Sequence, residues 1–131
     1  MKDKIARLRV DFPDFKFRKA KKARWDAAGQ VIYYTDDTRE LMHELGHAVL
    51  GHRFIESDVG LLRQERAAWT KAQELAVIYE VDLDEEYIEG RMDTYRRWLH
   101  KRSLCGICRY NAVEEGGRYR CVMCGNAWDK K

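Results

Sequence analysis

The stretch Glu40-Leu-Met-His43-Glu44-Leu-Gly-His47-Ala-Val-Leu-Gly51-His52 decides the interpretation of this chain, because it contains the pattern H-E-x-x-H. Residues four apart on an α-helix differ by about 40° around its axis, so His43 and His47 share one face. Their imidazoles can hold one zinc ion, and Glu44 would lie beside that ion as a general base. The alternative is a charged surface helix. The apolar side of this helix argues against it, and comprises Leu41, Leu45, Ala48 and Val49.

A third protein ligand is expected from the next predicted helix, residues 59–79. An apolar stripe runs along this helix through Leu62, Trp69, Ala72, Ala76 and Tyr79, and Glu65 fills the gap in it. A carboxylate on a buried stripe is costly unless it is paired or binds a metal, so Glu65 is the predicted ligand. Two alternatives stay open: Glu65 pairs with Arg66, or His52 is the ligand. His52 could reach the metal only if Gly51 turned the chain back.

The four cysteines all lie near the C-terminus, as two C-x-x-C pairs with twelve residues between them. They are Cys105, Cys108, Cys121 and Cys124. This spacing predicts a four-cysteine zinc ribbon around a hairpin at residues 114–117. Four thiolates leave no open coordination position, so this second zinc is expected to be structural. Redox-active cysteine pairs are the less favoured alternative.

The remaining segments predict an α+β fold. Residues 2–10 favour a short helix, and residues 15–34 favour a small antiparallel sheet. Asp37 and Glu40 have the spacing of a capping box before the H-E-x-x-H helix. A last amphipathic helix is expected over residues 85–101. The sequence therefore predicts a zincin-like minimal metallopeptidase domain of a small sheet and about four helices, residues 1–102, followed by a zinc ribbon, residues 103–131.

Charge is unevenly distributed along the 131 residues, although the formal net charge is only +3. Residues 1–24 hold ten basic and three acidic side chains, whereas residues 25–102 hold ten and sixteen. No apolar run approaches the roughly 20 residues of a membrane span, and the N-terminus lacks the apolar stretch of a signal peptide. We therefore expect an intracellular, cytoplasmic protein without a membrane partner.

Four short segments together resemble the ImmA/IrrE family of small zinc metallopeptidases over about residues 30–80. They are His43-Glu-Leu-Gly-His47, Leu50-Gly-His52, Glu65-Arg-Ala-Ala-Trp69 and Ala72-Gln-Glu-Leu-Ala76. The resemblance implies His43, His47 and Glu65 as zinc ligands and Glu44 as catalytic base. It also implies an intracellular protein, or one encoded by a phage or mobile element, that often cleaves helix-turn-helix repressors. Two features depart from the family: residues 76–83 contain no proline, and the cysteine module is added.

An H-E-x-x-H domain followed by a zinc ribbon also resembles SprT-like proteases, which act on proteins bound to DNA. Their third ligand is a downstream histidine, and only His52 and His100 are available here. A role at DNA is nevertheless suggested by six basic residues: Lys16, Arg18, Lys19, Lys21, Lys22 and Arg24. Basic residues interleaved with aromatic ones are typical of single-strand binders. A solvated strand face is at least as good an interpretation of these basic residues. A separate alternative to an enzyme is a non-catalytic DNA-associated regulator, in which the H-E-x-x-H zinc is only structural.

The predicted reaction is hydrolysis of a peptide bond in an intracellular protein, a repressor or another DNA-bound protein among the candidates, with two zinc ions per chain. A substrate strand is expected to pair with a sheet edge at residues 31–34. Tyr79 and Tyr95 are both candidate donors to the oxyanion, and the sequence does not choose between them.

Overall fold

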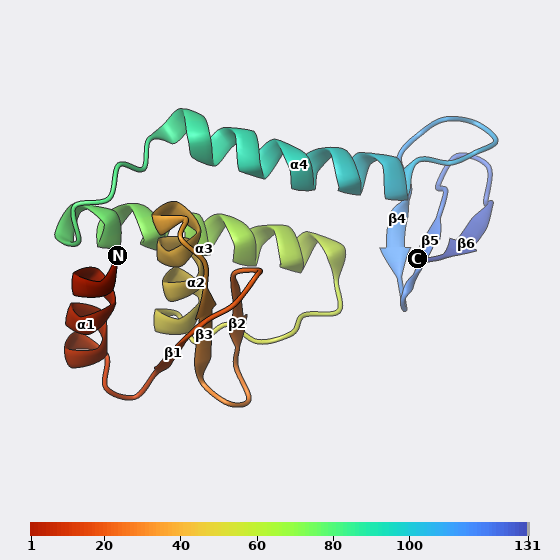
Figure 1. The fold of residues 1–131 in the computed structure, drawn as a ribbon. Coiled ribbons are helices and arrows are strands. Elements are labelled where there is room, and N and C mark those ends of the chain that lie inside the picture. Colours follow the sequence, from red (N-terminus) through yellow and green to blue (C-terminus); the bar gives the residue numbers. More distant parts are fainter. Residues whose placement is uncertain (131) are drawn as a thin grey trace.

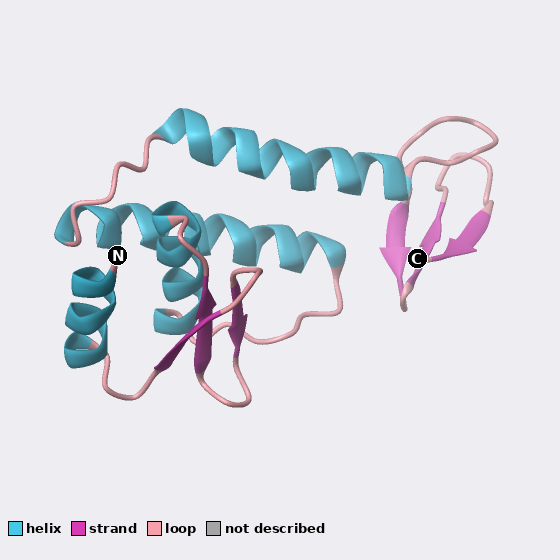
Figure 2. Cartoon of the chain, viewed as in Figure 1, coloured by secondary structure: helices cyan, strands magenta, loops and turns pink. Residues whose placement is uncertain are grey.

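The computed structural model describes residues 1–130, which form four helices and two three-stranded sheets (Figure 1, Figure 2). In chain order the elements are α1 Lys2–Asp11, β1 Lys16–Lys19, β2 Arg24–Asp26, β3 Val31–Tyr34, α2 Thr38–Val49, α3 Asp58–Ile78, α4 Glu85–Ser103, β4 Val113–Glu115, β5 Arg118–Arg120 and β6 Ala127–Asp129. The predicted α+β class and the four helices are confirmed. None of the helices within residues 1–130 is long and apolar enough to cross a bilayer.

The first sheet is mixed, with strand order β1-β3-β2. β2 and β3 form the predicted antiparallel hairpin, but β1 runs parallel to β3, with Lys16 opposite Val31. The prediction of an antiparallel sheet is therefore wrong for β1. Parallel neighbours need a connection that returns the chain to the same end of the sheet, and β2 makes that return. As a consequence β3 is the central strand.

Asp37 caps the start of α2: its side chain accepts hydrogen bonds from the backbone N–H groups of Arg39 and Glu40 at 3.0 and 3.3 Å. In a capping box the Glu40 side chain would accept the backbone N–H of Asp37. Here that N–H donates instead to the Thr35 hydroxyl at 3.1 Å. Gly51, with φ of 68°, lies in the left-handed region just after the helix, as the sequence predicted for its end.

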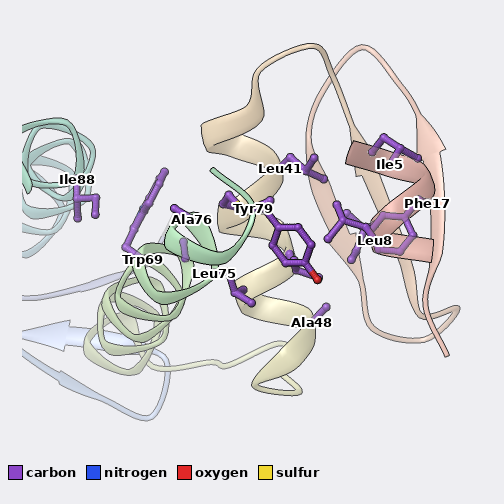
Figure 3. Close-up of a cluster of buried hydrophobic side chains, with 14 of the residues drawn as sticks. Ile5, Leu8, Phe17, Leu41, Ala48, Trp69, Leu75, Ala76, Tyr79 and Ile88 are labelled. Atoms are coloured by element: carbon purple, nitrogen blue, oxygen red, sulfur yellow. The ribbon is translucent and has the colours of Figure 1, made fainter. Parts of the chain in front are cut away.

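Helices α2 and α3 approach each other closely at Gly46. A Cβ atom at this position would lie 2.4 Å from the backbone oxygen of Ala68, so a larger residue does not fit. The main core lies around this contact and reaches α1, β1 and α4 (Figure 3). Its largest fully buried side chain is Trp69, on the α4 side of α3 (Figure 3).

Helix α4 runs back along α3, so the C-terminal sheet lies beside the start of α3 (Figure 1). Asp58, only 4% exposed, links the two parts. Its carboxylate binds the Arg102 guanidinium at 2.9 Å and the Tyr119 hydroxyl, and lies 3.5 Å from the Lys130 ammonium. Its backbone N–H donates to Glu114 at 2.9 Å. The cysteine-containing sheet is thus attached to the helical part by a buried carboxylate.

Candidate metal centre

Helix α2 brings His43, Glu44 and His47 together as one buried group that could hold a metal ion. Their side chains are turned inward because the apolar residues of the same helix pack against the sheet and α3. The Nε2 atoms of the two histidines lie 3.1 Å apart. This is the shared helix face that the spacing of four predicted.

Glu65 of α3 completes this group from the opposite side. Its Oε2 atom lies 2.8 Å from Nε2 of His43, and its Oε1 atom lies 3.2 Å from Nε2 of His47. Ligands about 2.0–2.1 Å from a tetrahedral zinc ion are roughly 3.3 Å apart, so shifts of a few tenths of an ångström would admit the ion. The two nitrogens and the carboxylate therefore fit a metal, with Glu44 adjacent.

The second ring nitrogen of His43 faces carboxylates that the sequence did not assign to the site. Nδ1 lies 3.4 Å from Glu44 and 3.6 Å from Glu40. Glu40 in turn accepts the Tyr87 hydroxyl at 3.1 Å and pairs with Arg91 at 3.3 Å. Its position three residues before His43 is the only sequence signal of this contact, because Glu40 matched a capping box equally well. Two residues of α4 thus support the His43 imidazole through Glu40.

The second ring nitrogen of His47 contacts His52, with 2.9 Å between the two Nδ1 atoms. Gly51 does turn the chain back, and the His52 N–H then donates to the His47 carbonyl at 2.9 Å. The Trp25 indole holds this turn by donating to the His52 carbonyl at 2.9 Å. His52 therefore lies on the side of His47 opposite Glu65, and the structure brings Glu65, not His52, to the two Nε2 atoms.

The electrostatics of the group favour a bound cation. Burial disfavours a charged His43, but the carboxylates of Glu40, Glu44 and Glu65 around it outweigh burial and raise the pKa of His43 to about 11. Burial likewise disfavours a charged Glu65, yet His43 and His47 hold the pKa of this carboxyl far below its usual range. Three carboxylates around two imidazoles can neutralise a divalent ion in this largely buried site.

A stacked tryptophan closes the helical side of the group. The Trp69 and His43 rings are parallel within 3°, with their centroids 4.1 Å apart. The Tyr87 ring packs edge-on against Trp69, with 5.8 Å between the ring centroids. The imidazole orientation is thereby fixed by packing as well as by hydrogen bonds. The apolar stripe of residues 59–79 predicts Trp69 in the core, but nothing in the sequence indicates its contact with His43.

The two candidate tyrosines lie in different places. Burial and the negative charge of the nearby Glu65 carboxylate raise the pKa of Tyr95 well above its usual range. The Tyr79 hydroxyl instead donates to Asp11 of α1 at 2.6 Å, where burial and that carboxylate raise the pKa of Tyr79 to about 12. Only Tyr95 of the two is brought to the candidate metal centre.

A cleft of about 500 Å³ opens the metal centre to solvent. Glu44, His47 and Glu65 line its floor, and β2 forms one wall through Arg24, Trp25 and Asp26. The expected edge at residues 31–34 is corrected by the strand order, since β3 is paired on both sides. The open sheet edge beside the cleft is β2.

The four cysteines form a second cluster that could hold a metal, between the ends of the C-terminal strands. The Sγ atoms of Cys105 and Cys124 are 3.7 Å apart, and those of Cys108 and Cys121 are 3.1 Å apart. Thiolates around zinc lie roughly 3.8 Å apart, so the cluster fits the ion with a small expansion. Amide hydrogen bonds, first from Cys108, lower the pKa of Cys105 to about 6. In Cys108 a backbone hydrogen bond at Tyr110 acts in the same direction, but the contact with Cys121 and burial outweigh it and raise the pKa of Cys108 to about 12. Without a cation, therefore, only part of the cluster favours the thiolate form that binds metal.

The hairpin between the two cysteine pairs is formed as predicted. β4 and β5 pair antiparallel, and Gly116 and Gly117 turn the chain with φ of 56° and 83°. Tyr119, which lies on β5 between the two cysteine pairs, is buried, and its hydroxyl donates to Asp58. β6 then adds a third strand.

Five of the six basic N-terminal residues lie on β1 and the loop after it, whereas Arg24 lies on β2, in the wall of the cleft beside the metal centre. Lys16, Arg18, Lys19, Lys21, Lys22 and Arg24 are all exposed. Lys19 pairs with Asp36 at 3.0 Å, and the Arg24 guanidinium lies 4.1 Å from the Tyr33 ring centroid. Phe17, the aromatic residue between Lys16 and Arg18 in the sequence, is buried in the core at 4% exposure, so it offers no face to a nucleobase.

Comparison of the chain with models of protein families, with curated proteins and with solved structures found no match.

Proposed function

We propose that this protein is a zinc-dependent metallopeptidase of the H-E-x-x-H type that hydrolyses peptide bonds in an intracellular protein, as its resemblance to the ImmA/IrrE family suggests. One observation carries the proposal: two imidazole nitrogens and the Glu65 carboxylate converge within 3.2 Å of one another on the floor of an open cleft. Two histidines and one glutamate with an open fourth position are a known ligand set of catalytic zinc.

His43, His47 and Glu65 would hold the ion. When bound, zinc would polarise the substrate carbonyl and make the attacking water more acidic. Glu44 would accept a proton from that water as it adds to the carbonyl carbon, and would pass the proton to the leaving nitrogen as the C–N bond breaks. Tyr95, at Glu65, is the better candidate than Tyr79 to donate a hydrogen bond to the developing oxyanion.

The open edge of β2 gives the substrate a place to bind. An extended peptide added to this edge would lie along the cleft wall, with its backbone hydrogen-bonded to the strand. The four-cysteine cluster would hold a second zinc ion with a structural role, because all four of its positions are filled by protein. We therefore expect two zinc ions per chain.

The test replaces Glu44 by Gln, which keeps the shape of the side chain and removes the base. A peptide library made from a digested proteome is the substrate, new termini are measured by mass spectrometry, and zinc is counted by elemental analysis. Loss of a general base should slow cleavage by about 10²–10⁴-fold while two zinc ions stay bound.

Glu86→Gln is the matched control, since this exposed glutamate lies in the first turn of α4. It should cleave like the wild-type protein. Equal cleavage by Glu44→Gln and wild type would refute the proposal and favour a site in which zinc is only structural.

A further inference from the structure

A second cavity, of about 680 Å³, lies where α4 meets the cysteine-containing sheet. The cavity is lined by Trp98, Lys101 and Arg102 of α4 and by Trp128 and Asp129 of β6. It shares none of these residues with the cleft at the metal centre. The proposed peptidase reaction makes no use of this cavity.

Its two indoles are held in place by neighbouring groups. Trp128 donates to the Arg102 carbonyl at 3.1 Å and stacks on Tyr119, with ring centroids 6.0 Å apart and planes 20° apart. Trp98 lies under the Arg102 guanidinium, 4.9 Å from its ring centroid. Both tryptophans are only half-buried, so aromatic surface remains accessible beside the cavity.

The surrounding part of the chain is strongly basic. Residues 96–131 hold nine basic and three acidic side chains, a net charge of +6, whereas residues 25–95 hold six and sixteen, a net charge of −10. In space, Asp58 pairs with Arg102 and Lys130, and Glu89 and Asp93 pair with Arg96, so these carboxylates offset part of the positive charge. The one carboxylate on the cavity wall, Asp129, is engaged by Arg118 at 2.6 Å. A polyanion would therefore be attracted to this end of the molecule and repelled by the middle.

We propose that this cavity binds single-stranded DNA, with bases stacked on Trp98 and Trp128 and phosphates near Lys101. Aromatic platforms beside cations are the means by which single strands are bound without sequence preference. A duplex keeps its bases stacked internally and cannot use the indoles. Among the residues that the structure describes, the carboxylate that lines the cavity is paired with Arg118, so no second carboxylate is available there to accept a ribose 2′-hydroxyl. The N-terminal basic residues are a weaker candidate, since Phe17 is buried.

The experiment measures fluorescence anisotropy of labelled oligo(dT), about fifteen nucleotides long, with the full-length, metal-loaded protein at several salt concentrations. Trp98→Leu should weaken binding about tenfold, because one stacking platform is lost. Lys101→Glu, at an exposed position, should weaken binding and reduce the dependence of the dissociation constant on salt. Zinc content and thermal melting verify that each variant is folded. If Trp98→Leu does not fold, the effect of Lys101→Glu on DNA binding tests the proposal.

The matched control is the double variant Lys21→Glu and Lys22→Glu in the exposed loop after β1. It changes charge without touching the cavity, so its affinity should stay within about twofold of the wild type at moderate salt. Absence of binding at low salt overturns the proposal. So does tighter binding of duplex DNA, of oligo(U) or of poly-glutamate, the last of which would indicate an acidic peptide ligand.

Discussion

At the scale of single residues, the two histidines of the metal centre differ in what holds their outer nitrogens. His43 faces carboxylates, whereas His47 faces the neutral ring of His52 at 2.9 Å. One of the two facing Nδ1 atoms must donate. If the donor is His47, its Nε2 lone pair stays directed at the metal position. His52→Ala should therefore weaken zinc binding at this centre by about 10–100-fold, measured by competition with a zinc chelator.

His100→Ala is the control for His52→Ala, because His100 is exposed and distant in sequence from the centre. The companion variant Glu65→Ala should lose this zinc altogether and keep the one at the cysteines. If Glu65→Ala keeps two zinc ions and His52→Ala binds one, then His52 is the ligand and the assignment of Glu65 is wrong.

Sequence spacing is informative about residues on one helix and much less so about contacts between elements. The spacing of His43 and His47 predicts a shared face, and the gap in the α3 stripe predicts a buried Glu65, as found. Glu40 and His52 could not be assigned in this way. The first depends on Tyr87 and Arg91 from α4, and the second on a turn at Gly51.

At the scale of elements, the metal centre depends on how closely α2 and α3 approach. Gly46 lies between the two histidines, and its added Cβ would meet the Ala68 backbone oxygen at 2.4 Å. Gly46→Ala must separate the helices, which should lower the free energy of unfolding by about 1–3 kcal/mol. The shift would also displace Glu65, one turn before Ala68. Urea unfolding and zinc content measure the two effects.

Gly90→Ala is the matched control in α4, because a Cβ there meets nothing within 4 Å. Alanine is the better helix former, so this variant should be more stable than wild type by up to about 1 kcal/mol. If Gly46→Ala and Gly90→Ala changed the free energy of unfolding equally, the close approach of α2 and α3 would not be the reason that position 46 requires glycine.

The small sheet shows which parts of an element order a sequence does not determine. The turn between residues 26 and 31 predicts the β2–β3 hairpin, because its partners are neighbours in the chain. The parallel pairing of β1 with β3 joins more distant segments and depends on Phe17 reaching the core beneath α1. Alternation along β1 predicts a strand but says nothing of its partner or direction.

At the scale of the whole molecule, Asp58 connects the two parts of the chain that carry the candidate metal-binding groups. It begins α3, the helix that carries Glu65, and it binds Tyr119 between the cysteine pairs. The sequence predicted both modules but not this contact, because Asp58 reads as an ordinary acidic residue at a helix start. Its burial arises only when α4 returns the chain to the beginning of α3 (Figure 1).

Asp58→Ala should therefore release the cysteine-containing sheet from the helical part. The substitution leaves Arg102 and the Tyr119 hydroxyl without this partner, and loss of one member of a buried charged pair costs about 3–5 kcal/mol. Arg102 keeps some solvent contact, so the lower end is expected. Hydrogen exchange should accelerate in β4–β6 and stay slow in α2. Asp93→Ala, which breaks the exposed pair with Arg96, should change neither. Uniform acceleration in both regions would mean that the two parts unfold as one unit.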